Sequence, residues 1–297
     1  MSLIPGSKLA WLADARCPPH LETALRLTAI ALLLRPMGPW FVRPGILGLA
    51  ALVLVSPRLL RTPAVWAATS ALVAVRIVDD WPLADNHIYL IAYWTLAVAL
   101  SLRSEDIPRA IATTSRWLLG LAFAFAVMWK VLLAPDFLDG RFFRVTLLTD
   151  PRFAEAARLI GGLTAEQLEA NRLALAPLPE GAALSEPLTV IEPPRLRLLA
   201  VISTWGILLL EASVAIAMLG PPRRHFAIAR HVLLLAFCLI TYAFAPVAGF
   251  GWLLLVMGAA QTRESESWWR RLYVAAFLLV LFYSEVPWAG LLLDVTT

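Results

Sequence analysis

Long apolar runs, separated by short connections that carry arginine, form the main pattern along the chain. Most runs are close to the roughly 20 residues that an α-helix needs to cross the hydrocarbon core of a bilayer. The pattern predicts an all-α fold, a polytopic transmembrane helix bundle. The second and eighth runs are short, which leaves the count at eight or nine spans; the candidates are residues 21–35, 40–56, 64–79, 85–102, 110–133, 197–219, 226–245, 247–261 and 270–293.

Arginine is concentrated in the connections that follow the even-numbered spans. Positively charged residues are retained on the cytoplasmic side of membrane proteins. We therefore expect an integral protein of the bacterial inner membrane, with a cytoplasmic N-terminus and an extracytoplasmic C-terminus. The residues that set this orientation are Arg58, Arg61, Arg103, Arg109, Arg223, Arg224, Arg263, Arg270 and Arg271.

One long connection, residues 134–195, interrupts the alternation on the external side. Residues 150–160 and 164–175 have helical periodicity, and Thr164 with Gln167 forms the pattern of a capping box at the start of the second stretch. We expect a single transmembrane domain, residues 1–297, into which this connection is inserted as a small extracytoplasmic helical cap.

The composition agrees with a membrane protein. Hydrophobic residues make up 60% of the chain and charged residues 15%, whereas a soluble domain is about half apolar and about a quarter charged. No run of lysine and arginine with interleaved aromatic residues is present, so we expect membrane lipid around the chain and no nucleic-acid partner. The four histidines and two cysteines fall mostly at different depths, so we expect no metal site.

Ionisable side chains inside the apolar runs are the candidate functional residues, because a charge in hydrocarbon is costly. His87 is expected at the outer start of the fourth span, and Lys130 one turn from the outer end of the fifth. Arg76, Tyr242 and Glu285 are expected at a similar level on three further spans. We expect His87, Lys130 and at least one of these three residues to line one cavity.

Simpler structural roles remain open for the same residues. Arg76 is at helical spacing from Asp79 and Asp80 and could form an ion pair with either. Lys130 could extend its ammonium group to the headgroups, as lysines near helix ends often do. Glu211 interrupts the apolar sequence in the middle of the sixth span, so it must be protonated, paired or in contact with water.

Two stretches carry a resemblance to a known family. Asp85-Asn86-His87-Ile88-Tyr89-Leu90 resembles the Asn-His-x-Tyr-Leu signature in the membrane domain of vitamin K-dependent gamma-carboxylases. The stretch from Met128 to Gly140 resembles that family's Lys-Leu-x-x-Asp-Trp-x-x-Gly segment, with one extra residue after Lys130. The wider bacterial group is the horizontally transferred transmembrane domain family. Two features depart from the carboxylases: Trp129 stands where they have a second lysine, and residues 134–195 stand where they have a large luminal domain.

The resemblance implies a membrane enzyme that uses a reduced quinone, similar to vitamin K hydroquinone, and O2, with or without CO2. It implies that Lys130 is the base that starts oxygenation of the quinol and that His87 assists at the same centre. A lipid-soluble quinone and a secreted peptide are the implied partners. The residues expected to contact the quinone are Asn86, Arg76, Tyr242, Glu285 and Trp129.

Lys130 can act as a base only as a neutral amine. Burial in an apolar helix disfavours the lysine cation, and the nearest acids in sequence, Asp136 and Asp139, lie beyond the predicted helix end. We therefore expect Lys130 to have no adjacent carboxylate and to be largely neutral at pH 7. A Lys130→Arg variant would then be inactive, because a guanidinium group stays protonated.

Two other classes of function fit the same pattern. One is a non-catalytic membrane partner in the maturation of, or immunity to, a secreted peptide. The other is a small-molecule transporter, since helix bundles with buried charges are common among transporters. Quinol oxidation that depends on Lys130 would distinguish an enzyme from both alternatives.

Overall fold

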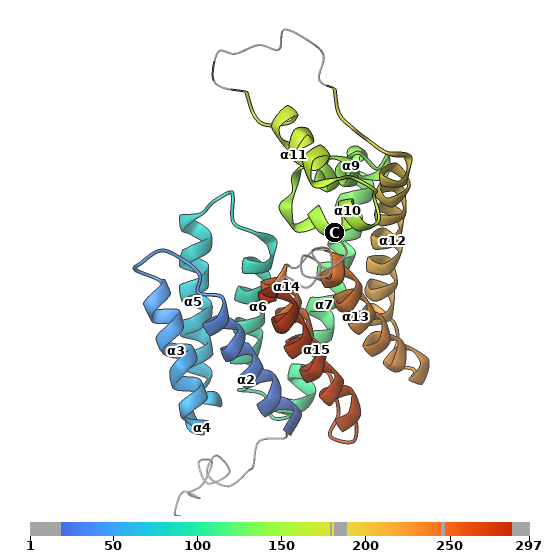
Figure 1. Ribbon diagram of the computed structural model, residues 1–297. Helices are drawn as coiled ribbons and strands as arrows, with labels where there is room; N and C mark the ends of the chain where they lie inside the picture. The colour runs from blue at the N-terminus through green and yellow to red at the C-terminus, as the bar shows by residue number, and fades with distance from the viewer. Residues whose placement is uncertain (1–18, 179, 181–188, 245–246, 287–297) are drawn as a thin grey trace, which may run out of the picture. The chain divides into compact units, whose positions relative to one another are not determined.

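The computed structural model describes residues 19–178, 180, 189–244 and 247–286, and every regular element among them is helical (Figure 1). Each of the nine apolar segments predicted from the sequence forms a helix within the described residues; residues 287–293 of the ninth segment lie outside them. These nine helices are α2 (Pro19–Leu34), α3 (Arg43–Val55), α5 (Pro63–Asp79), α6 (Asn86–Ser101), α7 (Ile107–Leu132), α12 (Pro194–Leu219), α13 (Arg224–Phe244), α14 (Ala248–Ala260) and α15 (Ser267–Glu285). The short helix α4 (Pro57–Leu60) follows α3.

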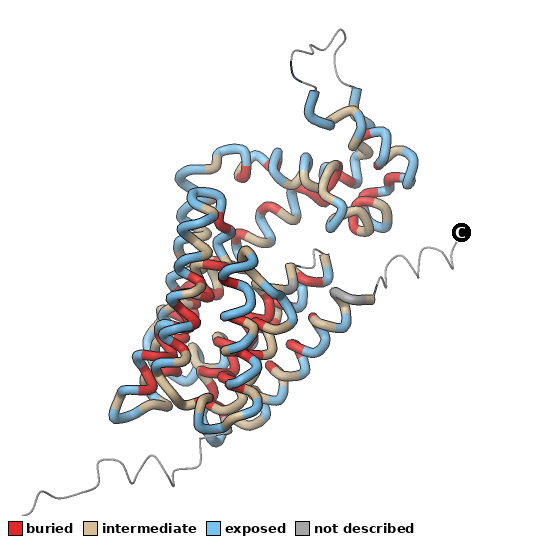
Figure 2. Tube along the Cα trace, turned by 90° about the vertical axis from the view of Figure 1, so that its left-hand side faces the viewer, coloured by how far each residue is buried: buried red, intermediate tan, exposed pale blue. Residues whose placement is uncertain are grey.

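Three of these helices, α7, α12 and α13, are long and apolar enough to cross a membrane. They contain 26, 26 and 21 residues, which at 1.5 Å per residue exceeds the roughly 30 Å of a hydrocarbon core. Most residues of these three helices are not buried, as expected of surfaces that contact lipid. Figure 2 colours the chain by the burial of each residue. The chain is therefore an integral membrane protein.

Proline in the first turn marks the start of several helices, including α3, α5, α8 (Pro135–Leu138) and α12. The N–H groups in the first turn of a helix have no intrahelical acceptor, so a proline there costs no hydrogen bond. The sequence predicted that the sixth span begins at residue 197, whereas α12 already begins at Pro194. This extension of one turn belongs to the cap, as described below.

The chain divides into two compact units, and the first contains residues 1–115 and 259–271. Within it, α5 packs against α6, where the Ser70 hydroxyl donates to the Ala92 carbonyl at 2.9 Å. The Trp94 indole of α6 donates to the Thr28 hydroxyl of α2 at 3.0 Å. Both tryptophan and threonine are buried, so these bonds satisfy polar groups that water does not reach.

The second unit contains residues 116–258 and 272–297 and includes most of α7 together with α12 and α13. Gly120 of α7 allows close approach to α12, since a Cβ atom there would lie 2.6 Å from Leu219 Cδ2. Phe123 of α7 meets Phe237 of α13 edge to face, with ring centroids 4.7 Å apart. Arg230 of α13 donates to the Ala217 carbonyl near the end of α12 at 2.8 Å.

Residues 135–174 of this unit form four short helices and a 3₁₀ turn: α8, α9 (Arg141–Thr149), η1 (Pro151–Phe153), α10 (Ala154–Leu159) and α11 (Ala165–Ala174). The predicted capping box at α11 is confirmed: Thr164 accepts from the Gln167 amide, and Gln167 accepts from the Thr164 amide. Together with the first turns of α12 these helices enclose an apolar core, which we call the cap core. It consists of Leu147, Leu148, Ala156, Ala157, Leu163, Leu168, Leu196, Leu199 and Ala200.

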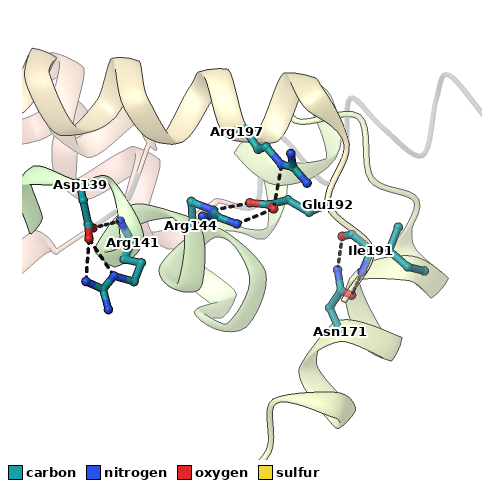
Figure 3. Close-up of polar contacts among 7 residues, drawn as sticks. All are labelled: Asp139, Arg141, Arg144, Asn171, Ile191, Glu192 and Arg197. Atoms are coloured by element: carbon teal, nitrogen blue, oxygen red, sulfur yellow. Dashed lines mark hydrogen bonds and ion pairs between the residues drawn. The ribbon is translucent and has the colours of Figure 1, made fainter. Parts of the chain in front are cut away.

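Polar contacts fasten the cap to the start of α12 (Figure 3). The Glu192 carboxylate accepts hydrogen bonds from Arg144 of α9 at 2.6 and 2.7 Å and from Arg197 of α12 at 2.9 Å. The buried Asn171 side chain donates to the Ile191 carbonyl and accepts from its amide, both at 2.8 Å. These bonds hold the segment before α12 against α9 and α11.

Candidate functional site

An ion pair joins two long apolar helices of the second unit. The Lys130 ammonium near the end of α7 donates to both carboxylate oxygens of Glu211 on α12, at 2.6 Å to Oε1 and 2.5 Å to Oε2. The Lys130 side chain is 19% exposed and that of Glu211 is 9% exposed. Two opposite charges thus lie together, with little access to water, between helices of membrane-spanning length.

The packing of α7 on α12 brings these residues to one level. The two helices run in opposite directions, and Gly120 lies against Met218 and Leu219. Lys130 follows Gly120 by roughly three turns, and Glu211 precedes Leu219 by roughly two. Beyond this level α7 ends at Leu132, whereas α12 reaches into the cap, where its first turns pack in the cap core.

Phe137 of α8 lies directly beyond the pair. Its ring centroid is 5.3 Å from the Lys130 nitrogen, within the range of a cation–π interaction. Phe137 is buried and contacts Phe142 and Phe143 of α9, with ring centroids 5.4 and 5.7 Å apart. Phe143 in turn packs against the cap core, so an aromatic path connects the ion pair to the cap.

Gly140 makes this arrangement possible. It joins α8 to α9 with φ at +81°, a left-handed conformation that strains any residue with a Cβ atom. A Cβ at this position would lie 3.7 Å from the Thr204 hydroxyl of α12. The glycine at the end of the motif around Lys130 therefore turns the chain from α8 into α9, whose Phe142 and Phe143 pack on Phe137.

The prediction that Lys130 has no adjacent carboxylate is wrong, because Glu211 occupies that position. The expected neutral amine was argued from the absence of such a neighbour, so that argument no longer applies. Of the three states predicted for Glu211, the structure shows the paired one. Asp139 is bound to Arg141 instead, at 2.7 Å, and these hydrogen bonds lower the pKa of its carboxyl group.

The Lys130–Glu211 pair has no net charge, which makes its position in an apolar environment tolerable. Lys130 presents donors, Glu211 presents acceptor oxygens, and the Phe137 ring limits access of water from the cap side. A hydroxyl group that entered between the charges could donate to the carboxylate and accept from the ammonium. The arrangement is thus suited to proton transfer with a weakly acidic hydroxyl.

His87, Asn86 and Arg76 lie in the first unit, and Lys130 lies in the second, so a shared cavity stays a prediction. Asn86 and His87 form the start of α6, with the side chain of Asn86 exposed and that of His87 half-buried. Arg76 is paired with Asp80 one turn along. This confirms the ion-pair alternative for Arg76.

The other three residues expected to bind a quinone differ in their surroundings. Trp129 of α7 is 60% exposed, next to Lys130 in sequence but on the outer face of the helix. Tyr242 of α13 is buried, and its ring lies against Gly251 of α14. Glu285 is the last residue of α15, and its side chain lies outside the described residues.

Two contributors to this site were not among the predicted site residues. Glu211 was identified as a residue in need of a partner, but nothing local links it to Lys130, 81 residues earlier. Phe137 lies in the quoted motif, yet apolar periodicity gives no sign that its ring lies over the ammonium. Among the described residues, no group of three or more His, Cys, Asp or Glu side chains is placed to hold a metal ion.

No family model, curated protein or solved structure matches the chain. The site therefore defines the protein only as an integral, all-helical membrane protein with a shielded ion pair beneath an aromatic residue of its cap.

Proposed function

We propose that the chain is a carboxylase-like integral membrane enzyme that acts on a reduced quinone of the vitamin K type and O2. The observation that carries the proposal is the Lys130–Glu211 pair, held by two hydrogen bonds between apolar helices and covered by Phe137. Such an intramembrane pair is a functional candidate by default. It also falls on the lysine of the motif that resembles the carboxylases.

The chemistry of a quinol fits this site. A quinol is a lipid-soluble phenol, and oxygenation begins when its hydroxyl loses a proton. The side chains that flank Lys130 on α7, Trp129 and Val131, are apolar and exposed and provide an approach from the lipid phase. The pair takes the proton, and Phe137 and its neighbours keep water from the resulting anion.

His87 is proposed as the second polar group of the centre, with Asn86 beside it at the start of α6. Arg76, Trp129, Tyr242 and Glu285 remain proposed quinone contacts, and Arg76 also forms an ion pair with Asp80. A secreted peptide and CO2 are proposed only as further reactants, since quinol oxygenation needs neither.

The proposed topology has eight or nine spans in the bacterial inner membrane, an N-terminus in the cytoplasm and a C-terminus outside. The helical conformation of all nine predicted segments, over their described residues, is compatible with this count. The cap carries exposed ion pairs, such as that of Asp139 with Arg141 at 2.7 Å, which suit an aqueous face. The cap, residues 134–195, is accordingly proposed to be extracytoplasmic.

The test is oxidation of a reduced vitamin K-type quinol by the purified protein in lipid nanodiscs. The reaction is measured as O2 uptake and as epoxide formation. Wild type and Glu169→Gln, a control on the exposed face of α11, should turn over. Lys130→Ala should lose activity, and His87→Ala should be slower. Absence of quinol oxidation in wild type would reject the enzyme and favour a transporter or a non-catalytic partner of a peptide.

A further inference from the structure

The paired state of Lys130 raises the question of where the proton of the substrate goes. The Lys130 nitrogen lies within hydrogen-bonding distance of both Glu211 oxygens, a geometry that fits an ammonium group and a carboxylate. An ammonium group has no lone pair with which to accept a proton. The free acceptor capacity of the site is on Glu211, because each carboxylate oxygen has two lone pairs.

We infer that Glu211 is the proton acceptor of the site and that Lys130 remains a cation throughout, stabilising the oxyanion of a phenolic substrate. The substrate class rests on the proposed function; the assignment of roles rests on the geometry. It makes Glu211 a catalytic residue and gives Lys130 an electrostatic role in place of the base role expected from the sequence.

The step is a proton transfer with a simple balance. The O–H bond of the phenol breaks, its electron pair stays on the phenol oxygen, and the proton binds a Glu211 oxygen. Lys130 shifts its hydrogen bonds from Glu211 to the new phenolate. Before and after the step the site contains one cation and one anion, so no net charge is created in the apolar environment.

The surroundings of the pair favour this exchange. Phe137 faces the ammonium at 5.3 Å, so the cation is held between the ring and the carboxylate. The Glu211 side chain is the more buried of the two, which suits a group that becomes a neutral acid when substrate binds.

A phenol whose anion is coloured, such as 4-nitro-1-naphthol, tests the roles without any turnover. It is titrated into purified wild type and variants in nanodiscs below its own pKa, and the anion is followed by absorbance while a pH indicator reports released protons. Wild type and Lys130→Arg should bind the anion without net proton release. Glu211→Gln should bind the anion and release about one proton per probe, because the acceptor is missing. Lys130→Gln should bind at least about 10-fold more weakly.

Three outcomes overturn the inference: wild type does not bind the probe or binds it as the neutral phenol, Lys130→Arg loses the bound anion while folded, or Glu211→Gln releases no proton. Thermal unfolding of each variant establishes that it is folded. Should Lys130→Arg not fold, Glu211→Asp decides, because a shorter carboxylate still accepts the proton and should release none. Glu169→Gln serves as the matched amide control on the exposed face of α11.

Quinol turnover then separates this inference from the proposed function. With Glu211 as the base, Glu211→Gln should slow quinol oxidation by about 100-fold or more, whereas Lys130→Arg should slow it less. Full activity in Glu211→Gln together with inactive Lys130→Arg would establish the lysine as base and reject the inference while retaining the enzyme. Wild type that ionises the probe but oxidises no quinol would reject the enzyme and retain the inference.

Discussion

Lys130 and Glu211 depend on each other for stability as well as for chemistry. Removing one partner leaves the other charge in an environment with little water, and loss of one member of a buried pair costs about 3–5 kcal/mol. We expect Lys130→Met and Glu211→Leu each to be destabilised by an amount of that order. The double variant should be close to wild type, since both charges are gone. Thermal unfolding in one detergent, analysed as a double-mutant cycle, measures the coupling; additive effects would show that the pair is not formed.

At the residue scale, the sequence identified which side chains need an explanation but not which ones meet. Lys130 and Glu211 were both recognised as charges in apolar helices. Their pairing depends on the antiparallel contact of α7 with α12, in which Gly120 lies against Leu219 and Lys130 meets Glu211. The pair Arg76–Asp80 was within reach of the sequence, since residues four apart on one helix are neighbours.

The close contact of α7 with α12 is a property of the elements, and it depends on Gly120. A Cβ atom at Gly120 would lie 2.6 Å from Leu219 Cδ2 and 3.1 Å from Met218 Cβ, so in Gly120→Ala the Leu219 side chain or the helices themselves must shift. We expect a loss of about 1–3 kcal/mol, typical of overpacking. At Gly206 of α12 an added Cβ atom would have no neighbour within 4 Å, so Gly206→Ala should be neutral or stabilising.

Thermal unfolding of the two alanine variants measures their stability. Ionisation of the naphthol probe, which requires the Lys130–Glu211 pair, is a second measurement. A change of register at Gly120 should also weaken ionisation of the naphthol probe. Equal stability of Gly120→Ala and Gly206→Ala would contradict the close approach of the two helices.

Glu192 couples the cap to α12 in a manner that depends on pH. Hydrogen bonds from Arg144, and then from Arg197, lower the pKa of this carboxyl group. A carboxyl group whose pKa is lower in the folded state contributes stability above its unfolded pKa, about 4.3, and loses it as the pH falls through the folded pKa. We expect proteolysis within the cap to accelerate below about pH 4.3 in wild type. Glu192→Gln should be more sensitive at pH 7 and change less with acid, while Glu169→Gln should follow wild type.

At the scale of elements, hydrophobic periodicity and helix-start signals were sufficient for the nine apolar helices and for α11. Their ends were less predictable where tertiary packing decides them. Pro194 starts α12 before the apolar run because its first turns complete the cap core. The small helices α8 and α9 depend on the left-handed turn at Gly140, a feature that apolar periodicity does not reveal.

At the scale of the whole molecule, the number of membrane spans depends on how the short apolar helices are counted. Three helices are long and apolar enough to cross a bilayer alone, whereas α3 has 13 residues. A helix of 13 residues is about 20 Å long, shorter than the hydrocarbon core, so it can cross only where neighbours or a thinner bilayer accommodate it. By hydropathy such a helix is a span, whereas by length it is not. The side of the membrane from which the connections before and after it can be labelled distinguishes the two.

Single cysteines in a variant with Cys17 and Cys238 replaced by serine provide that measurement. With the arginine-rich connections inside, Ser104→Cys, between α6 and α7, and Glu264→Cys, between α14 and α15, should react with a membrane-impermeant maleimide only after the cells are opened. Glu169→Cys in the cap should react in intact spheroplasts. Labelling of Glu264→Cys from outside, with Ser104→Cys still protected, would show that one of the helices after α7 does not cross and that the count is eight. Protection of Glu169→Cys would place the cap, and with it the side of the membrane nearest Lys130 and Glu211, in the cytoplasm.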